Sequence, residues 1–266
     1  VVVVGESEGG RLKPQPVSDF DRKMIAAAAA DPRRKEVPSL AVDEHREMYS
    51  RSGLGRAGMT DTASFFSPRN AIALLELWRA INAVKDDGLR RKLSFAFTAI
   101  LPRASRRYQW SAQRPLNAQN QIYYIAPVYY EWNVFELFQR KVNAALRADE
   151  ELLGGRGEPL FSSANAKLVS YELASADRLS HLADESVHYV FTDPPFGSNI
   201  FYSDMSLFHE AWLGSTTDNT REAVVHTTGK RRNGSAERYE ALLRGAFSEA
   251  CRILKPGRYM SVVFGN

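Results

Sequence analysis

Hydrophobic positions in the last hundred residues alternate between strand-like runs and helical spacing. Short apolar or alternating runs predict strands, and apolar residues three and four positions apart predict helices. The predicted order is strand, helix, strand, helix, helix, strand, at Lys167–Leu173, Leu179–Leu182, Val187–Phe191, Ser206–Leu213, Glu237–Leu254 and Met260–Phe264. Strands that alternate with helices indicate right-handed crossovers and a parallel sheet. The predicted fold class is therefore α/β.

The preceding part of the chain is predicted to be largely helical. Ser18 or Asp19 is a candidate N-cap for the first helix, and Pro68 suits the first turn of the second. Pro102 is expected to end the third helix. The predicted helices are Asp19–Ala30, one that starts at Pro68, Gly88–Leu101 and Asn133–Leu146.

These patterns divide the chain into three consecutive regions. Residues 1–60 form an irregular N-terminal segment, and residues 61–150 form a helical region with a basic, aromatic stretch. Residues 151–266 hold the α/β pattern. An extended segment is also predicted at Ile122–Val128.

The run Val187–Phe191 is followed by a proline-rich loop, Asp193-Pro194-Pro195-Phe196. Its β-branched and aromatic residues suit a strand that is buried on both faces of a parallel sheet. The two prolines cannot donate ladder hydrogen bonds and fix φ, so they end the strand, and Gly197 permits a tight turn. Open α/β sheets bind their ligands at the carboxyl ends of strands, so this rigid loop is the candidate site.

Composition is ordinary for a globular protein and changes the picture little. The chain has 266 residues, 44% hydrophobic and 25% charged, with a formal net charge of +4, which is compatible with a nucleic-acid partner. The single cysteine, Cys251, excludes an internal disulfide framework and is predicted to be buried. No metal site and no membrane span are predicted. The chain lacks an initial Met and starts and ends in strand-like runs, so a fragment of a longer protein is expected.

Two basic stretches are candidates for contacts with nucleic acid. In the first, arginines alternate with aromatic residues, a combination that binds phosphates and stacks on bases. The second is predicted to be a mobile loop. A solvated basic loop explains the first stretch equally well. The residues are Arg103, Arg106, Arg107, Tyr108, Trp110 and Arg114 in the first stretch and Lys230, Arg231 and Arg232 in the second.

Two glycine motifs match known patterns without the context that these require. Gly5–Gly9 fits the G-x-S-x-G pattern of hydrolases, but a hairpin turn explains it better, and Ser7 is a remote candidate nucleophile. Gly53–Gly58 fits G-x-G-x-x-G, but no predicted strand precedes it. We interpret it as a basic loop.

The Asp-Pro-Pro-Phe loop suits the binding of an exocyclic amine of a nucleobase. The lone pair of such an amine is delocalised into the ring, so an enzyme that methylates it must favour tetrahedral geometry at nitrogen. Asp193 can accept one N–H hydrogen bond and the Pro194 carbonyl the other, while Phe196 stacks on the base. The prolines hold the loop rigid, so little reorganisation is needed.

At this point the sequence resembles the S-adenosylmethionine-dependent amino methyltransferases that act on adenine N6 or cytosine N4. Their signature is Asp/Asn/Ser-Pro-Pro-aromatic. A bacterial subgroup identified as adenine-specific DNA methylases is similar over about residues 60–266. The similar segments are Phe191–Asp204, Phe65–Asn70 and the turn Ile253–Gly257. The resemblance implies a class I, Rossmann-like sheet, S-adenosyl-L-methionine as cofactor, DNA as substrate, and a cytoplasmic enzyme of host modification or phage defence.

The resemblance also implies roles for single residues. Asp177 matches the acidic position that contacts the cofactor's adenine, although it could simply cap a helix at Leu179. Asp193 is expected near the cofactor as well as the amine. Asn199, Tyr202 and Asp204 would lie on the substrate side, with packing as the alternative for Tyr202.

One departure from the family concerns the cofactor. The Gly-rich loop of the Asp-Pro-Phe-x-Gly-x-Gly type is absent, which predicts that residues upstream of Val1 complete the cofactor site and that the chain alone is incomplete. Two alternatives therefore stay open. One is an RNA base methyltransferase, and the other is a nucleic-acid-binding module with an inactive methyltransferase fold.

Overall fold

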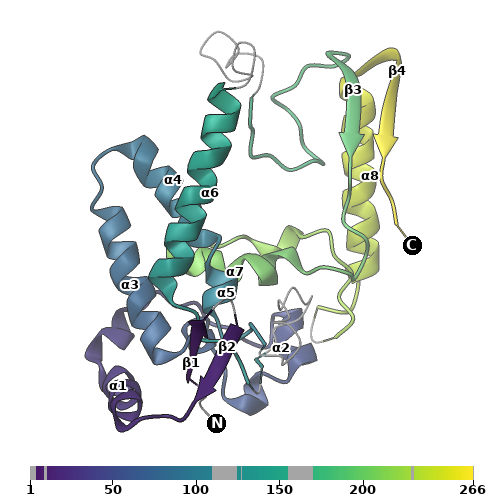
Figure 1. Cartoon of the computed structure of the whole chain (residues 1–266). Helices are drawn as coiled ribbons and strands as arrows, with labels where there is room; N and C mark the ends of the chain where they lie inside the picture. The colour runs from purple at the N-terminus through teal and green to yellow at the C-terminus, as the bar shows by residue number, and fades with distance from the viewer. Residues whose placement is uncertain are drawn as a thin grey trace. The chain divides into compact units, whose positions relative to one another are not determined.

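The computed structural model of the chain describes residues 4–8, 11–109, 125–126, 128–154, 170–228 and 231–265. The fold is mixed α/β, as predicted, with helices throughout and a small parallel sheet near the C-terminus (Figure 1). Most of the predicted extended segment Ile122–Val128 lies outside the described residues.

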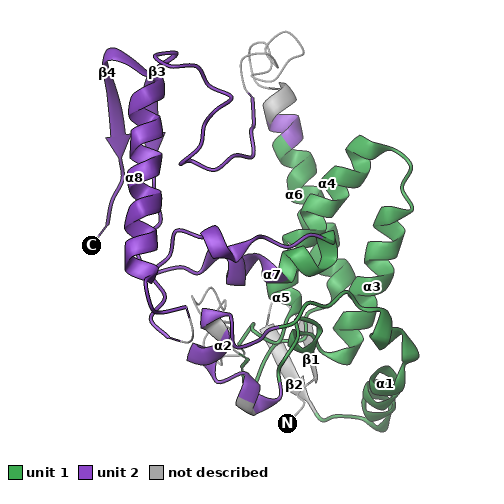
Figure 2. Cartoon of the chain, turned by 180° about the vertical axis from the view of Figure 1, so that it is seen from behind, with its two compact units in different colours: residues 1–41, 59–148, 208–214 green, residues 42–58, 149–207, 215–266 purple. Residues whose placement is uncertain are grey.

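Two compact units make up the chain, and both are discontinuous in sequence (Figure 2). Unit 1 comprises residues 1–41, 59–148 and 208–214. Unit 2 comprises residues 42–58, 149–207 and 215–266. The predicted regions were consecutive, whereas the segment 42–58 belongs with the C-terminal unit.

Unit 1 contains a hairpin and a set of helices. The hairpin pairs β1 (Val4–Glu8) with β2 (Arg11–Gln15) in antiparallel fashion. Gly5–Glu8 thus lie in its first strand rather than in the predicted turn, and Gly9 lies outside the described residues. The helices are α1 (Asp19–Ala30), η1 (Pro32–Glu36), η3 (Ala63–Phe65), α3 (Pro68–Asn82), α4 (Asp87–Thr98), α5 (Leu101–Ala104) and α6 (Val134–Gly154), whose last turns fall in unit 2.

Local sequence explains where these helices begin. Ser18 closes a capping box with Asp21 at the start of α1, and Ser67 accepts a hydrogen bond from the backbone N–H of Asn70 before Pro68 opens α3. The predicted third helix is split, because α4 ends at Thr98 and Pro102 lies in the first turn of α5. Proline is tolerated there because the backbone N–H groups of the first turn have no acceptor within the helix, so no hydrogen bond is lost.

Aromatic side chains form the centre of unit 1. Phe97 is fully buried, and its ring lies 4.8 Å from that of Trp78 and 5.1 Å from that of Trp212, measured between centroids. Phe65 is also fully buried and meets Phe208 edge-on at 4.7 Å. These rings lock α3, α4 and the end of α7 together within the unit.

Unit 2 contains the parallel sheet. Its elements are α2 (Glu47–Ser52), η2 (Gly55–Ala57), β3 (Val187–Thr192), α7 (Tyr202–Leu213), η4 (Asn219–Arg221), α8 (Ser235–Ile253) and β4 (Leu254–Val262), and the boundary with unit 1 falls inside α7. β3 and β4 pair in parallel, with Tyr189 opposite Tyr259, and α8 runs alongside them (Figure 1). The predicted strand–helix–strand order is confirmed for this pair, but β4 begins at Leu254, within the predicted turn Ile253–Gly257, rather than at Met260.

Four expectations for unit 2 are wrong. Ser170–Leu173, the described part of the first predicted strand, forms no strand, and 179–182 is a turn rather than a helix. β3 is not buried on both faces, because Tyr189 is 53% and Phe191 65% exposed. Cys251 is exposed, since it lies on the side of α8 away from Ala250 and Ile253, which are buried.

The segment before β3 is held in place by a cluster of ion pairs and hydrogen bonds, not by pairing with another strand. Arg252 of α8 donates to the carbonyls of Leu179 and Leu182, at 3.0 Å each, and to the Asp184 carboxylate. Glu249 accepts from Arg252 and from the Leu179 backbone N–H. The hydrogen bonds from Arg252 and Leu179 lower the pKa of Glu249 from 4.5 to about 2.

Low pH is expected to weaken this ion-pair cluster. The folded-state pKa of Glu249 is depressed, so its contribution to stability is present above pH 4.5 and is lost as pH falls towards 2. Thermal unfolding of Glu249→Gln and of the wild type from pH 7 to pH 2 should show a difference in Tm that shrinks below pH 4.5. The exposed Glu240, on the same helix, supplies the control Glu240→Gln. A constant difference for Glu249→Gln across this range would contradict the prediction.

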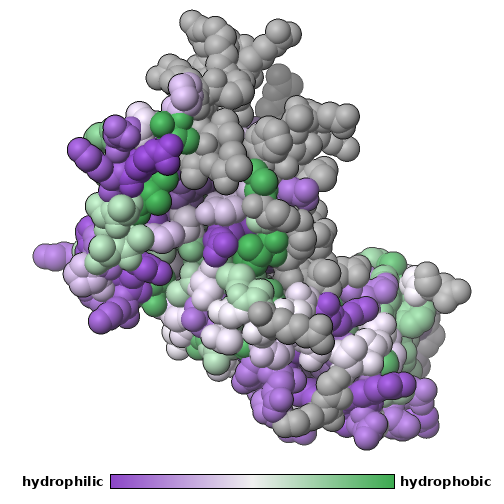
Figure 3. All heavy atoms as spheres, turned by 90° about the horizontal axis from the view of Figure 1, so that it is seen from below, coloured by the Kyte–Doolittle hydropathy of each residue, from purple (hydrophilic) through white to green (hydrophobic). Residues whose placement is uncertain are grey.

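Two general features complete the fold. No helix of the described chain is long and apolar enough to cross a membrane. On the face drawn in Figure 3, hydrophilic residues cover much of the described surface, with hydrophobic residues scattered among them.

Candidate functional site

The candidate site is the Asp-Pro-Pro-Phe loop (Asp193–Phe196), which follows β3 directly. The ladder with the C-terminal segment continues to the Thr192 carbonyl, which accepts a hydrogen bond of 2.9 Å from the backbone N–H of Val263. The prolines then end it, because neither has an N–H. Pro194 is buried, whereas Asp193 is exposed. The loop therefore lies at the carboxyl end of a parallel strand, as predicted.

Hydrogen bonds fix the second half of the loop. The Tyr239 hydroxyl of α8 donates to the Pro195 carbonyl at 2.7 Å and accepts from the Gly197 backbone N–H at 3.2 Å. The backbone N–H of Asn199 donates to the Phe196 carbonyl at 3.1 Å. Gly197 has φ of 55°, a left-handed conformation that favours glycine. The turn after the prolines is thus closed by partners on both sides.

The first half of the loop keeps its acceptors free. Among the described residues, no donor is found for the Asp193 carboxylate or for the Pro194 carbonyl. Both groups accept hydrogen bonds, and they belong to consecutive residues. They form a pair of acceptors of the kind that a primary amine needs.

Phe196 supplies an aromatic ring beside these acceptors. The ring is half-buried and meets Phe264 edge-on, with centroids 5.5 Å apart and an interplanar angle of 74°. This contact supports the ring from the β4 side. A face of the ring that stays accessible can stack on a base.

The residues predicted for the substrate side differ in exposure. Asn199 and Tyr202 are exposed, the latter by 50%, so both are accessible. Asp204 is buried, and its carboxylate forms an ion pair of 3.1 Å with Arg46. Asp204 therefore holds the start of α7 rather than facing a substrate.

A second buried carboxylate, Glu47, anchors the segment that follows η4. It accepts hydrogen bonds from the backbone N–H groups of Thr227 and Thr228, at 3.1 and 3.0 Å, and its other oxygen lies 3.4 Å from His226 Nδ1. Burial alone raises the pKa of Glu47, but the hydrogen bonds from Thr227, whose hydroxyl also donates at 2.7 Å, and from Thr228 outweigh it together with His226, so the pKa lies below its usual value. The sequence did not single out Glu47, since a lone acid in an irregular segment carries no periodic pattern.

Asp177, the predicted cofactor contact, is already engaged. Its carboxylate accepts from the Ser175 hydroxyl and from Arg221, with oxygens 2.9 and 3.3 Å from the guanidinium. The hydrogen bond from Ser175 and the charge of Arg221 lower its pKa. No helix follows at Leu179, so capping is not its role either.

The basic residues predicted to contact nucleic acid lie in different environments. Arg103 is exposed, Arg106 is half-buried over the Tyr129 ring, and Arg107 is buried with its guanidinium 5.1 Å from the Phe208 ring centroid. Arg107 thus belongs to the core of unit 1 and presents no charge at the surface. Arg231 donates to Asn219 and Arg232 is exposed, while Lys230, Trp110 and Arg114 lie outside the described residues.

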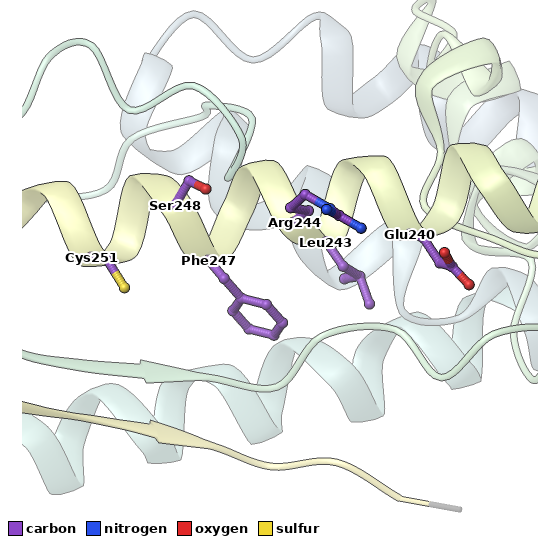
Figure 4. Close-up of a pocket in the computed structure, with 6 residues that line it drawn as sticks. All are labelled: Glu240, Leu243, Arg244, Phe247, Ser248 and Cys251. Atoms are coloured by element: carbon purple, nitrogen blue, oxygen red, sulfur yellow. The ribbon is translucent and has the colours of Figure 1, made fainter.

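The other motifs and hollows that the structure describes provide no competing site. α2 precedes Gly53–Gly58 where a dinucleotide motif needs a strand, and Ser7 lies within β1. An open hollow lies along α8, where Leu243 and Phe247 project from the same side of the helix (Figure 4). Its lining comes from a single helix and includes one basic and one acidic residue, Arg244 and Glu240. Among the described residues no cluster of His, Cys, Asp or Glu is arranged to hold a metal ion.

Comparison with known proteins adds no assignment, because no protein-family model, curated protein or solved structure matches this chain. The interpretation of the loop therefore depends on its own geometry and on the resemblance of its residues.

Proposed function

We propose that the chain binds and methylates the exocyclic amine of a nucleobase in DNA, with adenine N6 the preferred target over cytosine N4. The observation that carries the proposal is the pair of unpartnered acceptors, Asp193 and the Pro194 carbonyl, on a rigid loop at the carboxyl end of a parallel strand. The class I methyltransferase fold belongs to the same proposal and is supported by the parallel β3–α8–β4 unit.

The residues of the loop have distinct tasks in this proposal. The Asp193 carboxylate and the Pro194 carbonyl each accept one amine N–H, which directs the nitrogen lone pair out of the plane of the base. Phe196 stacks on the base, a contact worth about 1–3 kcal/mol. A base in duplex DNA leaves its stack to reach such a loop, and unstacking costs a few kcal/mol.

S-adenosyl-L-methionine is the methyl donor that the resemblance implies, and the described residues do not fit it. The Asp177 carboxylate is occupied by Ser175 and Arg221, and no glycine-rich turn follows a strand in the described α/β segment. The described chain thus supplies the amine-binding half of the site. This observation favours, as a second candidate function, a nucleic-acid-binding module that recognises an unstacked base without methylating it.

Discrimination between adenine and purine tests the amine-binding step that both candidates share. Purine lacks the exocyclic amine of adenine. Replacing one adenine of a short single-stranded DNA with purine therefore removes both proposed hydrogen bonds. We expect fluorescence anisotropy to show about 30-fold weaker binding, from a loss of about 2 kcal/mol. Equal affinity for the two oligonucleotides would overturn the proposal. The same pair made as RNA distinguishes the two nucleic acids, and stronger discrimination in RNA would reassign the substrate.

Exposed arginines are expected to set the salt dependence of this binding. Arg103 and Arg232 are exposed, so each can neutralise one phosphate. For single strands the slope of log affinity against log salt changes by about 0.7 per phosphate contact. Arg103→Gln and Arg232→Gln should each lower the slope by about this amount, whereas Arg91→Gln, an exposed residue on α4, serves as the control. Unchanged slopes would show that the two arginines are solvated surface.

A further inference from the structure

We propose that Tyr239 is a positioning residue of the Asp-Pro-Pro-Phe loop and determines which proline carbonyl receives the amine. The inference rests on the proposed function. Tyr239 does not itself need to touch the base, because it acts through the backbone of the loop.

The contacts of Tyr239 span the turn after the prolines. Its hydroxyl is the donor to the Pro195 carbonyl and the acceptor from the Gly197 N–H, at 2.7 and 3.2 Å. One oxygen thereby bridges the two peptide groups that flank Phe196. The side chain is half-buried and comes from α8, a helix of 19 residues whose far end is tied to the 179–184 segment by Arg252.

This bridge makes the two carbonyls of the Pro-Pro pair different, because it hydrogen-bonds only one of them. The Pro195 carbonyl is engaged by Tyr239, while the Pro194 carbonyl has no donor among the described residues. An incoming amine therefore finds one proline acceptor, next to the Asp193 carboxylate. Without the hydroxyl, both carbonyls compete for the amine, and the peptide group between Pro195 and Phe196 loses the one hydrogen bond that holds it among the described residues.

A second consequence concerns Phe196. The backbone N–H of Asn199 and the ring of Phe264 also hold this residue, but neither contact fixes the Pro195 carbonyl. The Tyr239 hydroxyl is thus the link between the orientation of the acceptors and that of the stacking ring. A displacement of about 1 Å at such a site reduces a rate by about 100-fold.

The variant Tyr239→Phe tests the inference, since it removes one oxygen and keeps the ring. We expect the adenine-over-purine preference to fall about tenfold while affinity for the purine oligonucleotide is unchanged. In the full-length gene product we expect kcat for methyl transfer to fall between about 10-fold and 100-fold with little change in KM. Tyr259→Phe, an exposed tyrosine on β4, should behave like the wild type.

Amide hydrogen exchange at Gly197 supplies a readout that needs no activity. Its N–H donates to Tyr239, so exchange should be faster in Tyr239→Phe and unchanged in Tyr259→Phe. A wild type that does not prefer adenine would contradict the proposed function, and Gly197 exchange would still test the bridge. A wild type that prefers adenine, with the same preference, kcat and Gly197 exchange in Tyr239→Phe, would overturn this inference alone.

Discussion

The substitution Asp193→Ala is expected to abolish methyl transfer, with a loss of at least about 100-fold in kcat. Asp193 is exposed and has no donor among the described residues, so its carboxylate is available to the amine and its removal disturbs no internal contact. The lost hydrogen bond is one to a charged acceptor, which is stronger than one between neutral groups. The assay is transfer of labelled methyl from S-adenosyl-L-methionine to DNA by the full-length gene product.

Two further variants sharpen that experiment. Asp193→Asn keeps one acceptor oxygen without the charge, so its rate should lie between those of the wild type and Asp193→Ala. Glu240→Ala removes an exposed carboxylate from α8 and should leave the rate unchanged. Calorimetry should show the same cofactor affinity for Asp193→Ala as for the wild type. Wild-type turnover by Asp193→Ala would exclude the loop as the amine site.

Phe97→Ala is expected to be the most destabilising single truncation in unit 1, by about 3–5 kcal/mol. The side chain is fully buried between the rings of Trp78 and Trp212, so its removal leaves a cavity that rigid aromatic neighbours cannot fill. Denaturant unfolding, followed by the fluorescence of these tryptophans, measures the free energy of unfolding.

Phe95→Ala is a matched control on the same helix. Phe95 is 72% exposed, two positions from Phe97, so its truncation should change the free energy of unfolding by about 0.5 kcal/mol or less. Similar losses for the two variants would show that the helix face of α4 is assigned wrongly.

The parts of unit 2 that sequence predicts well are those set by local patterns. The apolar run Val187–Phe191, the helical spacing of α8 and the two prolines depend on neighbours in the chain, and they place the loop correctly. The caps of α1 and α3 are equally local, since Ser18 and Ser67 need partners three residues away.

Local sequence patterns do not predict contacts between residues that are distant in the chain. Tyr239 fits the inward-facing set of α8 by its spacing, but its bond to Pro195 joins positions 44 residues apart. The pairing of Asp177 with Arg221 spans 44 residues as well, and it removes the carboxylate that the resemblance assigned to the cofactor. Arg107 carries a charge typical of the surface, yet the Phe208 ring beneath its guanidinium makes burial tolerable.

The backbone of Gly197 sets how the loop would respond to random mutagenesis. A Cβ at this position would meet no atom within 4 Å, so substitutions are disfavoured by the left-handed φ of 55° alone and not by a clash. Asparagine tolerates that conformation better than other side chains, whereas β-branched residues do not. A library randomised at residue 197 and selected for a working loop should therefore return glycine first and asparagine second, with valine, isoleucine and threonine depleted.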